Sequence, residues 1–202
     1  ASSGAGIFTA QFFGSHDDEG VRYTFRFKFL VCSVISALGM ALLLFGDQFF
    51  IGLYLTGEGN PAEAAEILNY GVQYLHIMIW GFLPFALTNT YASTLKETGN
   101  TFVPMVAGII ATLVNLVGNY ILIFGHFGAP QLGVQGAALA TVVSRFVELA
   151  IVAGWTHLNT EKNPFILGVY RSFYLPGRLL KAITLKGMPL LVNEFLWASG
   201  MA

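Results

Sequence analysis

The feature that most constrains this chain is a run of 47 residues, from Thr98 to Ser144, that contains no Asp, Glu, Lys or Arg. About 20 consecutive apolar residues are enough to cross the roughly 30 Å hydrocarbon layer of a bilayer. The run therefore has the length of two membrane-spanning helices and a short connection. Charged residues make up only 10% of the chain, against about 25% in soluble proteins. The sequence predicts an integral, multi-pass membrane protein.

Four complete spanning helices are predicted from the apolar stretches, with approximate bounds of residues 29–55, 67–95, 102–124 and 133–156. A partial span precedes them at residues 2–14, and another begins near Gly187. We therefore expect an all-α, polytopic membrane helix bundle that is a piece of a larger protein. Gly81 and Pro84 in the second span predict a kink, which membrane helices tolerate.

The basic residues predict which loops face the cytoplasm. Nine of the ten Lys and Arg residues lie in the loops near residues 15–28, 96–101 and 158–186. The loops near Glu58 and at residues 125–135 contain no Lys or Arg. Because cytoplasmic loops of membrane proteins are enriched in Lys and Arg, the first group is predicted to be cytoplasmic. Within the last loop, residues 178–183 mix bases with an apolar stripe and are predicted to lie along the membrane interface.

Several classes of function are not expected from this composition. The net charge of −1 provides no basic face for nucleic acid. The single Cys32 excludes a disulfide within the chain. The sequence contains no phosphate-binding glycine loop, no Cys or His cluster with metal-ligand spacing, and no nucleophile–base pair. We therefore expect neither an enzyme nor a bound cofactor, and we look for function among the polar residues inside the spans.

Three of these polar residues are Asn115, Asn119 and Thr141. The two asparagines are four residues apart, so their side chains lie on one helix face. Their amide oxygens could coordinate a hard cation or organise a hydrogen-bond network, or they could simply join helices. The hydroxyl of Thr141 could be a ligand, or it could bond the carbonyl oxygen four residues earlier. The residue spacing leaves these alternatives open.

Four ionisable residues of the predicted spans are further candidates. Arg145 and Glu148 are three residues apart and are predicted to form an intramembrane ion pair, because an unpaired charge at mid-depth is costly. The pair could be structural or could take part in transport. Glu194, with no base nearby in the sequence, is a candidate proton carrier. His76 is interpreted as a structural histidine.

The order of several motifs resembles the multidrug and toxic compound extrusion (MATE) family. The motifs are residues 6–14, 98–105, 115–125 and 132–141, together with Lys186-Gly187-Met188-Pro189 at the start of a span. The resemblance covers essentially the whole chain. It implies a fold of twelve helices in two lobes that exchanges organic compounds for Na⁺ or H⁺ by alternating access.

By this resemblance the chain is part of the N-terminal lobe. Residues 1–157 would hold the end of helix two and helices three to six, residues 158–186 the cytoplasmic inter-lobe linker, and residues 187–202 the start of helix seven. Helix one, which carries the family's cation-binding aspartate, and most of the C-terminal lobe would be the missing partners.

The partners of that aspartate would correspond to Asn115, Asn119 and Thr141, a candidate Na⁺ or H⁺ coupling site. Some members have Asp at the second of these positions, where this chain has Asn119, so the identity of the coupling ion stays open. Glu194 lies on the helix where some bacterial branches carry a functional glutamate, in a register about one turn shallower than expected. Its equivalence to that glutamate is therefore a hypothesis.

The leading functional hypothesis is part of a cation-coupled exporter of amphipathic, often cationic organic compounds in the plasma or inner membrane. A first alternative is a flippase for lipid-linked sugars, which would need a more basic cavity. A second alternative is a structural or truncated subunit, in which the polar residues would point into helix contacts without access to water.

Overall fold

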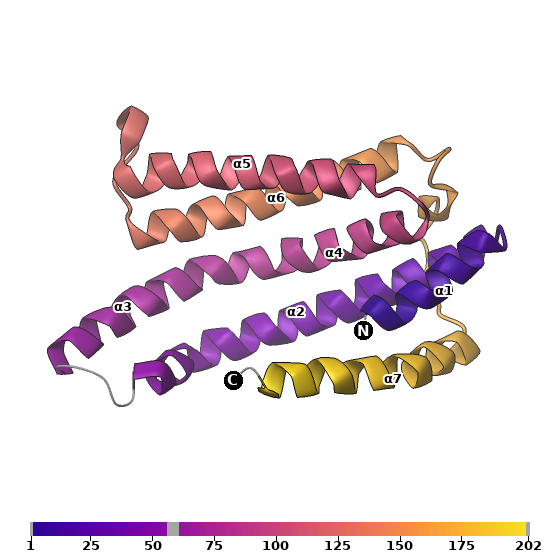
Figure 1. Ribbon diagram of the computed structural model, residues 1–202, viewed down its shortest axis with the longest axis horizontal. Coiled ribbons are helices and arrows are strands. Elements are labelled where there is room, and N and C mark those ends of the chain that lie inside the picture. The colour runs from indigo at the N-terminus through magenta and orange to yellow at the C-terminus, as the bar shows by residue number, and fades with distance from the viewer. Residues whose placement is uncertain (1, 56–60, 201–202) are drawn as a thin grey trace. The chain divides into compact units, whose positions relative to one another are not determined.

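The computed structural model describes residues 2–55 and 61–200. Within these ranges the structure describes only the backbone at some positions, namely residues 2–3, 48, 50, 52–55, 61–65, 191, 194–195 and 198–199. The described part is helical and contains no β-strand (Figure 1). Its elements in order are α1 (Ser2–Gly14), α2 (Asp18–Leu55), α3 (Pro61–Met78), η1 (Ile79–Gly81), α4 (Phe82–Glu97), α5 (Phe102–Phe124), η2 (His126–Gly128), α6 (Val134–Leu158), η3 (Pro164–Ile166) and α7 (Gly177–Gly200).

Four helical stretches are long and apolar enough to cross a membrane, which confirms the predicted number of complete spans. They are Asp18–Asp47, Glu66–Glu97, Phe102–Phe124 and Val134–Leu158. The third agrees with its predicted bounds, and the fourth differs by no more than two residues at either end. Near the kink predicted in the second span, the 3-10 turn η1 interrupts the regular α-helix between α3 and α4. The chain is an integral multi-pass membrane protein.

Most of the segment predicted as a loop at residues 15–28 is helical, because α2 already begins at Asp18. Two local features explain the early start. The carboxylate of Asp17 accepts a hydrogen bond from the backbone N–H of Gly20 (2.9 Å), as in an N-terminal cap. Asp18 and Glu19 in the first turn interact favourably with the helix dipole.

The structure also differs from the predicted division of the chain at residue 186. A single helix, α7, runs from Gly177 to Gly200 with Pro189 inside it. The segment predicted to lie along the interface is therefore continuous with the segment predicted to begin the next span.

The chain divides into two compact units, and the long helices contribute to both. Unit 1 is Ala1–Val34, Leu87–Met105 and Ile151–Ala202, and unit 2 is Ile35–Ala86 and Val106–Ala150.

Within unit 1, α1 packs against α7 (Figure 1). The buried core here consists of Ala5 and Phe8 of α1, Phe27 of α2 and Ile183 of α7. The two backbones come so close that a Cβ atom on Gly4 would lie 2.8 Å from the Cα atom of Gly187. Small residues at such a crossing are what allow membrane helices to approach closely.

Two arginines of α2 hold the segment between α6 and α7. The guanidinium of Arg26 donates to the carbonyl oxygens of Val169 (2.7 Å) and Gly168 (2.9 Å). Arg22 donates to the carbonyl oxygen of Phe165 (3.2 Å). Arg26 is 7% exposed. It is therefore a buried structural residue, in addition to being one of the basic residues used to predict the cytoplasmic side.

Replacing Arg26 with lysine is expected to loosen this segment, because an ammonium group cannot reproduce the two bonds of the planar guanidinium. Losing one charge-assisted bond would speed chymotrypsin cleavage after the exposed Phe173 and Tyr174 by about fivefold or more. Mass spectrometry of timed digests measures the rate. Arg178→Lys, at an exposed position of α7, is the control, and equal digestion of both variants would contradict the assignment.

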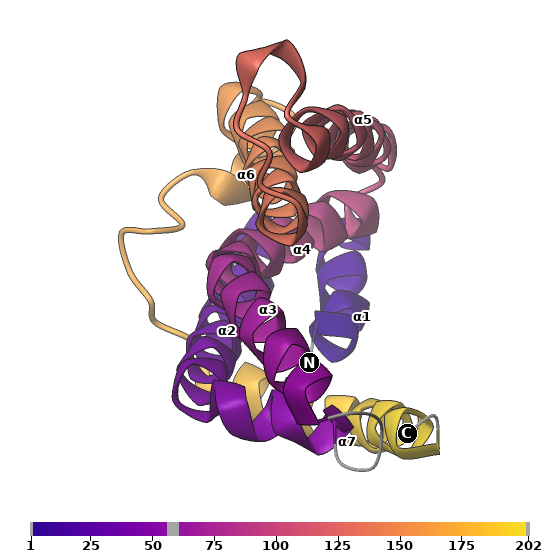
Figure 2. The ribbon, with the colours of Figure 1, turned by 90° about the vertical axis from the view of Figure 1, so that its left-hand side faces the viewer.

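Within unit 2, α5 and α6 lie side by side (Figures 1 and 2). Two glycines make the contact close. A Cβ atom on Gly136 would lie 2.6 Å from the carbonyl oxygen of Leu122, and one on Gly118 would lie 3.0 Å from the Cβ of Ala140. This short separation allows short polar side chains on the two helices to reach each other.

Candidate functional site

The three polar residues predicted to act together are brought together by the contact between α5 and α6. The amide nitrogen of Asn119 donates to Oδ1 of Asn115 (3.1 Å), and the amide nitrogen of Asn115 donates to Oγ1 of Thr141 (3.1 Å). The hydroxyl of Thr141 in turn donates to the carbonyl oxygen of Ala137 (2.9 Å). The bond of Thr141 to its own helix is therefore confirmed, and its hydroxyl oxygen also accepts a hydrogen bond from Asn115, while a role as a cation ligand stays a prediction.

These hydrogen bonds form a chain in which each donor points toward the next residue, from Asn119 through Asn115 and Thr141 to Ala137. Because the Thr141 proton is used on Ala137, its oxygen accepts from Asn115, and the Asn115 oxygen then faces the amide nitrogen of Asn119. The atoms left with unused bonding capacity in this chain are mostly oxygens, which are acceptors. The cluster is therefore suited to a group that donates hydrogen bonds or to a cation.

Asn119 Oδ1 is the clearest of these acceptors, because it is buried and accepts no hydrogen bond from the described residues. In the described part only two other side-chain atoms are buried in this way, the hydroxyl oxygens of Ser36 and Thr88. A buried polar atom without a partner costs about 1–3 kcal/mol. Such an atom calls for an explanation, and a bound ion is one.

Two cavities of unit 2 adjoin this cluster. The first, about 290 Å³, is lined mainly by polar residues: Thr112, Asn115, Thr141, Ser144, Arg145 and Glu148, with Gly108 and Ala111. The second, about 180 Å³, is mainly apolar and is lined by Met78, Gly81, Phe82, Phe85, Thr141 and Arg145. Thr141 and Arg145 line both cavities.

The predicted ion pair on α6 is present but loose. Arg145 Nη1 lies 3.5 Å from Glu148 Oε2, whereas charge-assisted hydrogen bonds are usually about 2.7–2.9 Å long. The guanidinium carbon also lies 4.6 Å from the centre of the Phe85 ring, which is cation–π geometry. Arg145 therefore divides its interactions between a carboxylate and an aromatic ring.

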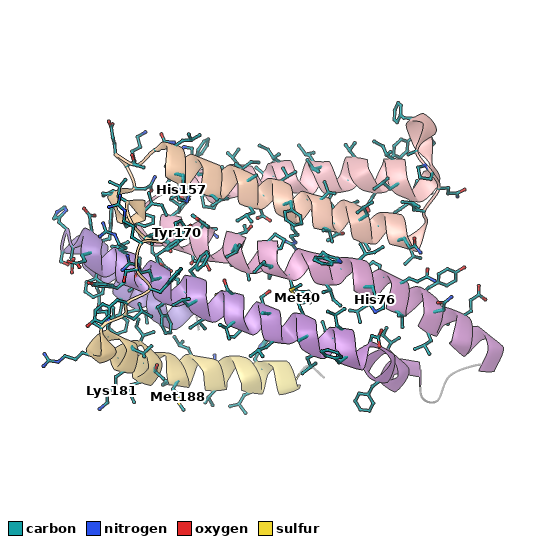
Figure 3. The ribbon with its side chains drawn as sticks, turned by 180° about the vertical axis from the view of Figure 1, so that it is seen from behind. Met40, His76, His157, Tyr170, Lys181 and Met188 are labelled. Carbon is teal, nitrogen blue, oxygen red and sulfur yellow. The ribbon has the colours of Figure 1, made fainter. Side chains whose placement is uncertain are left out.

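The remaining candidates lie elsewhere. His76, labelled in Figure 3, is 2.9 Å from the carboxylate of Asp47, which gives the histidine the partner that a structural role requires. The side chain of Glu194 lies outside the described residues, although its backbone belongs to α7.

Sequence reasoning missed a buried ion pair in unit 1. Lys28 was assigned to a cytoplasmic loop, but its side chain is fully buried and pairs with Glu97 at the end of α4. Its ammonium also donates to Thr94 Oγ1 (3.1 Å) and Ser93 Oγ (3.3 Å). Gly6 of α1 leaves room for Glu97, because a Cβ on that glycine would collide with the carboxylate. The position of Lys28 directly before an apolar run was the only sequence signal.

A second missed cluster joins α4, α6 and the segment before α7. The hydroxyl of Tyr91 is hydrogen-bonded to Nε2 of His157 (3.0 Å) and to the hydroxyl of Tyr170. The rings of His157 and Tyr170 are stacked with centres 5.8 Å apart (Figure 3). No motif connects these three residues, so the sequence offered no means to find them.

The spans and the polar cluster within them define a class: a multi-pass helical membrane protein with a hydrogen-bonded polar site inside its bundle. Residues 1–121, more than half of the chain, match the sequence model of the MatE family. The chain therefore belongs to the MatE family, whose members are transporters rather than enzymes.

Individual relatives agree with this assignment. The chain is 27% identical to the probable multidrug resistance protein NorM of Thermotoga maritima, over 100% of this chain and 41% of that protein. It is 31% identical to the probable NorM of Bacillus licheniformis, over 84% of this chain and 37% of that protein. The chain thus spans about 40% of the length of these relatives.

A solved structure supports the fold. An inward-facing multidrug resistance MATE family transporter of the MOP superfamily matches 93% of this chain and 40% of its own chain, with a TM-score of 0.76 and 20% identity. This likeness confirms the predicted partial bundle of MATE type.

Proposed function

We propose that this chain forms part of a secondary active exporter that moves amphipathic, cationic organic compounds out of the cell in exchange for Na⁺ or H⁺. Family membership supports transport, and the relatives named above are described as multidrug resistance proteins. The apolar cavity lined by Phe82 and Phe85 can contact an aromatic or apolar part of such a compound. Alternating access then requires that substrate and cation each bind one conformation better than the other.

The coupling site of this proposal is the cluster of Asn115, Asn119 and Thr141, with the side chain of Glu194 as a further candidate. The observation that carries the assignment is the buried, unbonded Oδ1 of Asn119 at the end of a chain of hydrogen bonds. A Na⁺ ion prefers oxygen ligands, and a protonated group can donate to the same oxygen. Asn115 and Thr141 of this cluster also line the 290 Å³ cavity, through which a cation can reach these two residues.

The two alternative functions are less well supported. A flippase for lipid-linked sugars would need a basic cavity to hold phosphates, whereas Arg145 is the single basic residue lining the two described cavities of unit 2. A structural subunit would enclose its polar residues in helix contacts, whereas Asn115 and Thr141 line an open cavity.

Replacing Asn119 with alanine tests the coupling site. In proteoliposomes with the natural full-length protein, we expect ethidium efflux driven by a Na⁺ or pH gradient to fall by about tenfold, which lies within the usual range of coupling between sites. Ethidium binding without cation should change by less than about twofold. The loss follows because Asn115 loses its donor and the cluster loses an oxygen ligand.

Asn69→Ala is a matched control, because Asn69 forms an exposed amide pair with Gln73 four residues later (3.1 Å). Gradients of Na⁺ and of pH are applied separately, so that the coupling ion is identified in the same assay. Efflux by Asn119→Ala equal to that of the control would remove the amide cluster from the mechanism.

A further inference from the structure

The connection between α5 and α6 carries an aromatic ring in an exposed position. Phe127, in the turn η2, is 90% exposed. Residues 125–135 contain no Asp, Glu, Lys or Arg, and the two helices that they join are both long and apolar enough to span a membrane. A phenyl ring left in water forgoes the favourable free energy of burying its apolar surface. Its exposure here therefore raises the question of what surrounds it.

The backbone turns Phe127 outward at a conformational cost. Phe127 has a φ of 58° and a ψ of 25°, in the left-handed region that L side chains adopt reluctantly. The glycines at 125 and 128 also have positive φ, 74° and 82°, but glycine adopts these angles without a steric cost. A strained residue persists where its surroundings compensate for the strain, and the described residues leave the Phe127 ring almost uncovered.

Contacts within unit 2 hold this turn in place. The ring of His126 stacks on that of Tyr120, with ring centres 4.2 Å apart and planes inclined by 16°. The backbone N–H of Leu132 donates to the carbonyl oxygen of Leu122 (2.9 Å), which closes the base of the connection. The outward position of Phe127 is therefore set by the fold.

The turn also projects sideways from the helix ends. Figures 1 and 2 show η2 beside the end of α5, displaced across the helix axes rather than along them. The axes of spanning helices cross the bilayer, so a sideways displacement at their ends runs within the plane of one leaflet. Phe127 thus lies at the depth where the two spans end, which is the boundary between hydrocarbon and headgroups.

An apolar face of α5 leads up to this turn. Leu116, Tyr120 and Phe124 follow one another at intervals of four residues, so they share one helix face, and all three are exposed. Phe127 continues this apolar surface beyond the last residue of the span. Because the surface runs without a break from the middle of the span to the turn, a lipid partner is favoured over water.

We propose that η2 is a membrane anchor, and that Phe127 inserts between phospholipids of the leaflet opposite the basic loops. Aromatic side chains of membrane proteins concentrate at this depth. The lipid removes the ring from water, which compensates for the strained backbone. Since residues 125–135 carry no Asp, Glu, Lys or Arg, no such charge has to enter the interface with the ring. The inference goes beyond the proposed export function and does not depend on it.

Site-directed labelling measures what surrounds residue 127. The natural full-length protein, with Cys32 and any other cysteine replaced by serine, receives a bimane fluorophore at Phe127→Cys and is placed in phosphatidylethanolamine–phosphatidylglycerol nanodiscs. Iodide should quench this label at least about fivefold less than a label at Glu161→Cys, an exposed loop position, because an ion does not enter the apolar layer. A nitroxide near the headgroup end of the lipid acyl chain should quench the label at 127 but not the label at 161.

The other two outcomes would overturn the inference. Equal quenching of both labels by iodide would place residue 127 in water. Protection of the label at 127 from both iodide and the lipid nitroxide would place it against another part of the longer protein.

Unlabelled variants test the same inference through stability. Asparagine tolerates a left-handed backbone better than phenylalanine does, so Phe127→Asn should raise the thermal midpoint if the residue faces water. With the ring in lipid, Phe127→Asn should lower the midpoint in nanodiscs by about 2–4 °C, because the lost insertion outweighs the relieved strain. Phe127→Trp, which suits the interface, and Gln131→Asn, at an exposed position of the same connection, should leave the midpoint unchanged. A higher midpoint for Phe127→Asn than for the parent would contradict the anchor.

Discussion

Replacing Lys28 with methionine is expected to lower the free energy of unfolding by about 3 kcal/mol or more, because it removes one partner of a buried ion pair. The Glu97 side chain, 18% exposed, would lose the ammonium group that compensates for its carboxylate. Methionine preserves most of the apolar volume of the lysine stem, so the change isolates the electrostatic loss. Reversible unfolding in mixed micelles of increasing SDS content, followed by tryptophan fluorescence, measures the difference.

A second variant makes this prediction specific. Replacing both residues, Lys28→Met with Glu97→Gln, should recover most of the loss, since no uncompensated charge remains. Lys181→Met is the control at an exposed position of α7. A Lys28→Met variant as stable as the control would show that the pair contributes nothing, and a double variant no more stable than the single one would implicate packing instead.

Replacing Gly136 with alanine is expected to destabilise the contact between α5 and α6 by about 1–3 kcal/mol, the usual cost of overpacking. The added Cβ would lie 2.6 Å from the carbonyl oxygen of Leu122, and backbone cannot move aside as a flexible side chain would. The helices must separate, and the bond between Asn115 and Thr141 lengthens with them. We therefore expect both a lower midpoint of unfolding and weaker cation binding.

Gly154→Ala provides a matched control on the same helix, because a Cβ at Gly154 meets nothing within 4 Å. This change should be neutral or slightly stabilising, since alanine favours helix more than glycine does by about 1 kcal/mol. Equal unfolding midpoints for the two variants would contradict the close approach at Gly136.

The predicted charges show where sequence reasoning succeeded and where it failed. Nine basic residues were placed in three loops from their number and position alone. The structure shows that two of them, Arg26 and Lys28, lie within α2 and are buried. Burial became tolerable because carbonyl oxygens and a carboxylate accept their hydrogen bonds. None of these acceptors can be recognised from the residues adjacent to the two bases.

The candidate site was predicted more completely than the interior of unit 1. Asn115 and Asn119 had to share a helix face, because four residues make about one turn. The small residues before Thr141 indicated a tight contact for its helix. Because the connection between the two spans is short, the two helices were expected to be neighbours. The side chains of all three residues were therefore expected to lie at one helix contact. The cluster of Tyr91, His157 and Tyr170 had no such constraint and was not predicted.

The sequence by itself determined the number of complete spans, the bounds of the last two to within two residues, and the family of the protein. These features depend on consecutive residues. The number of apolar residues in a row decides whether a helix can cross the hydrocarbon layer, and each family motif is a short stretch of sequence. Only the tertiary structure decided which polar groups are satisfied and which are not. Lys28 and Glu97 are separated by 69 residues, and the unbonded oxygen of Asn119 is defined by what surrounds it in space. In a low-dielectric interior, a polar group depends on the few atoms within hydrogen-bonding distance, and folding alone brings those atoms together.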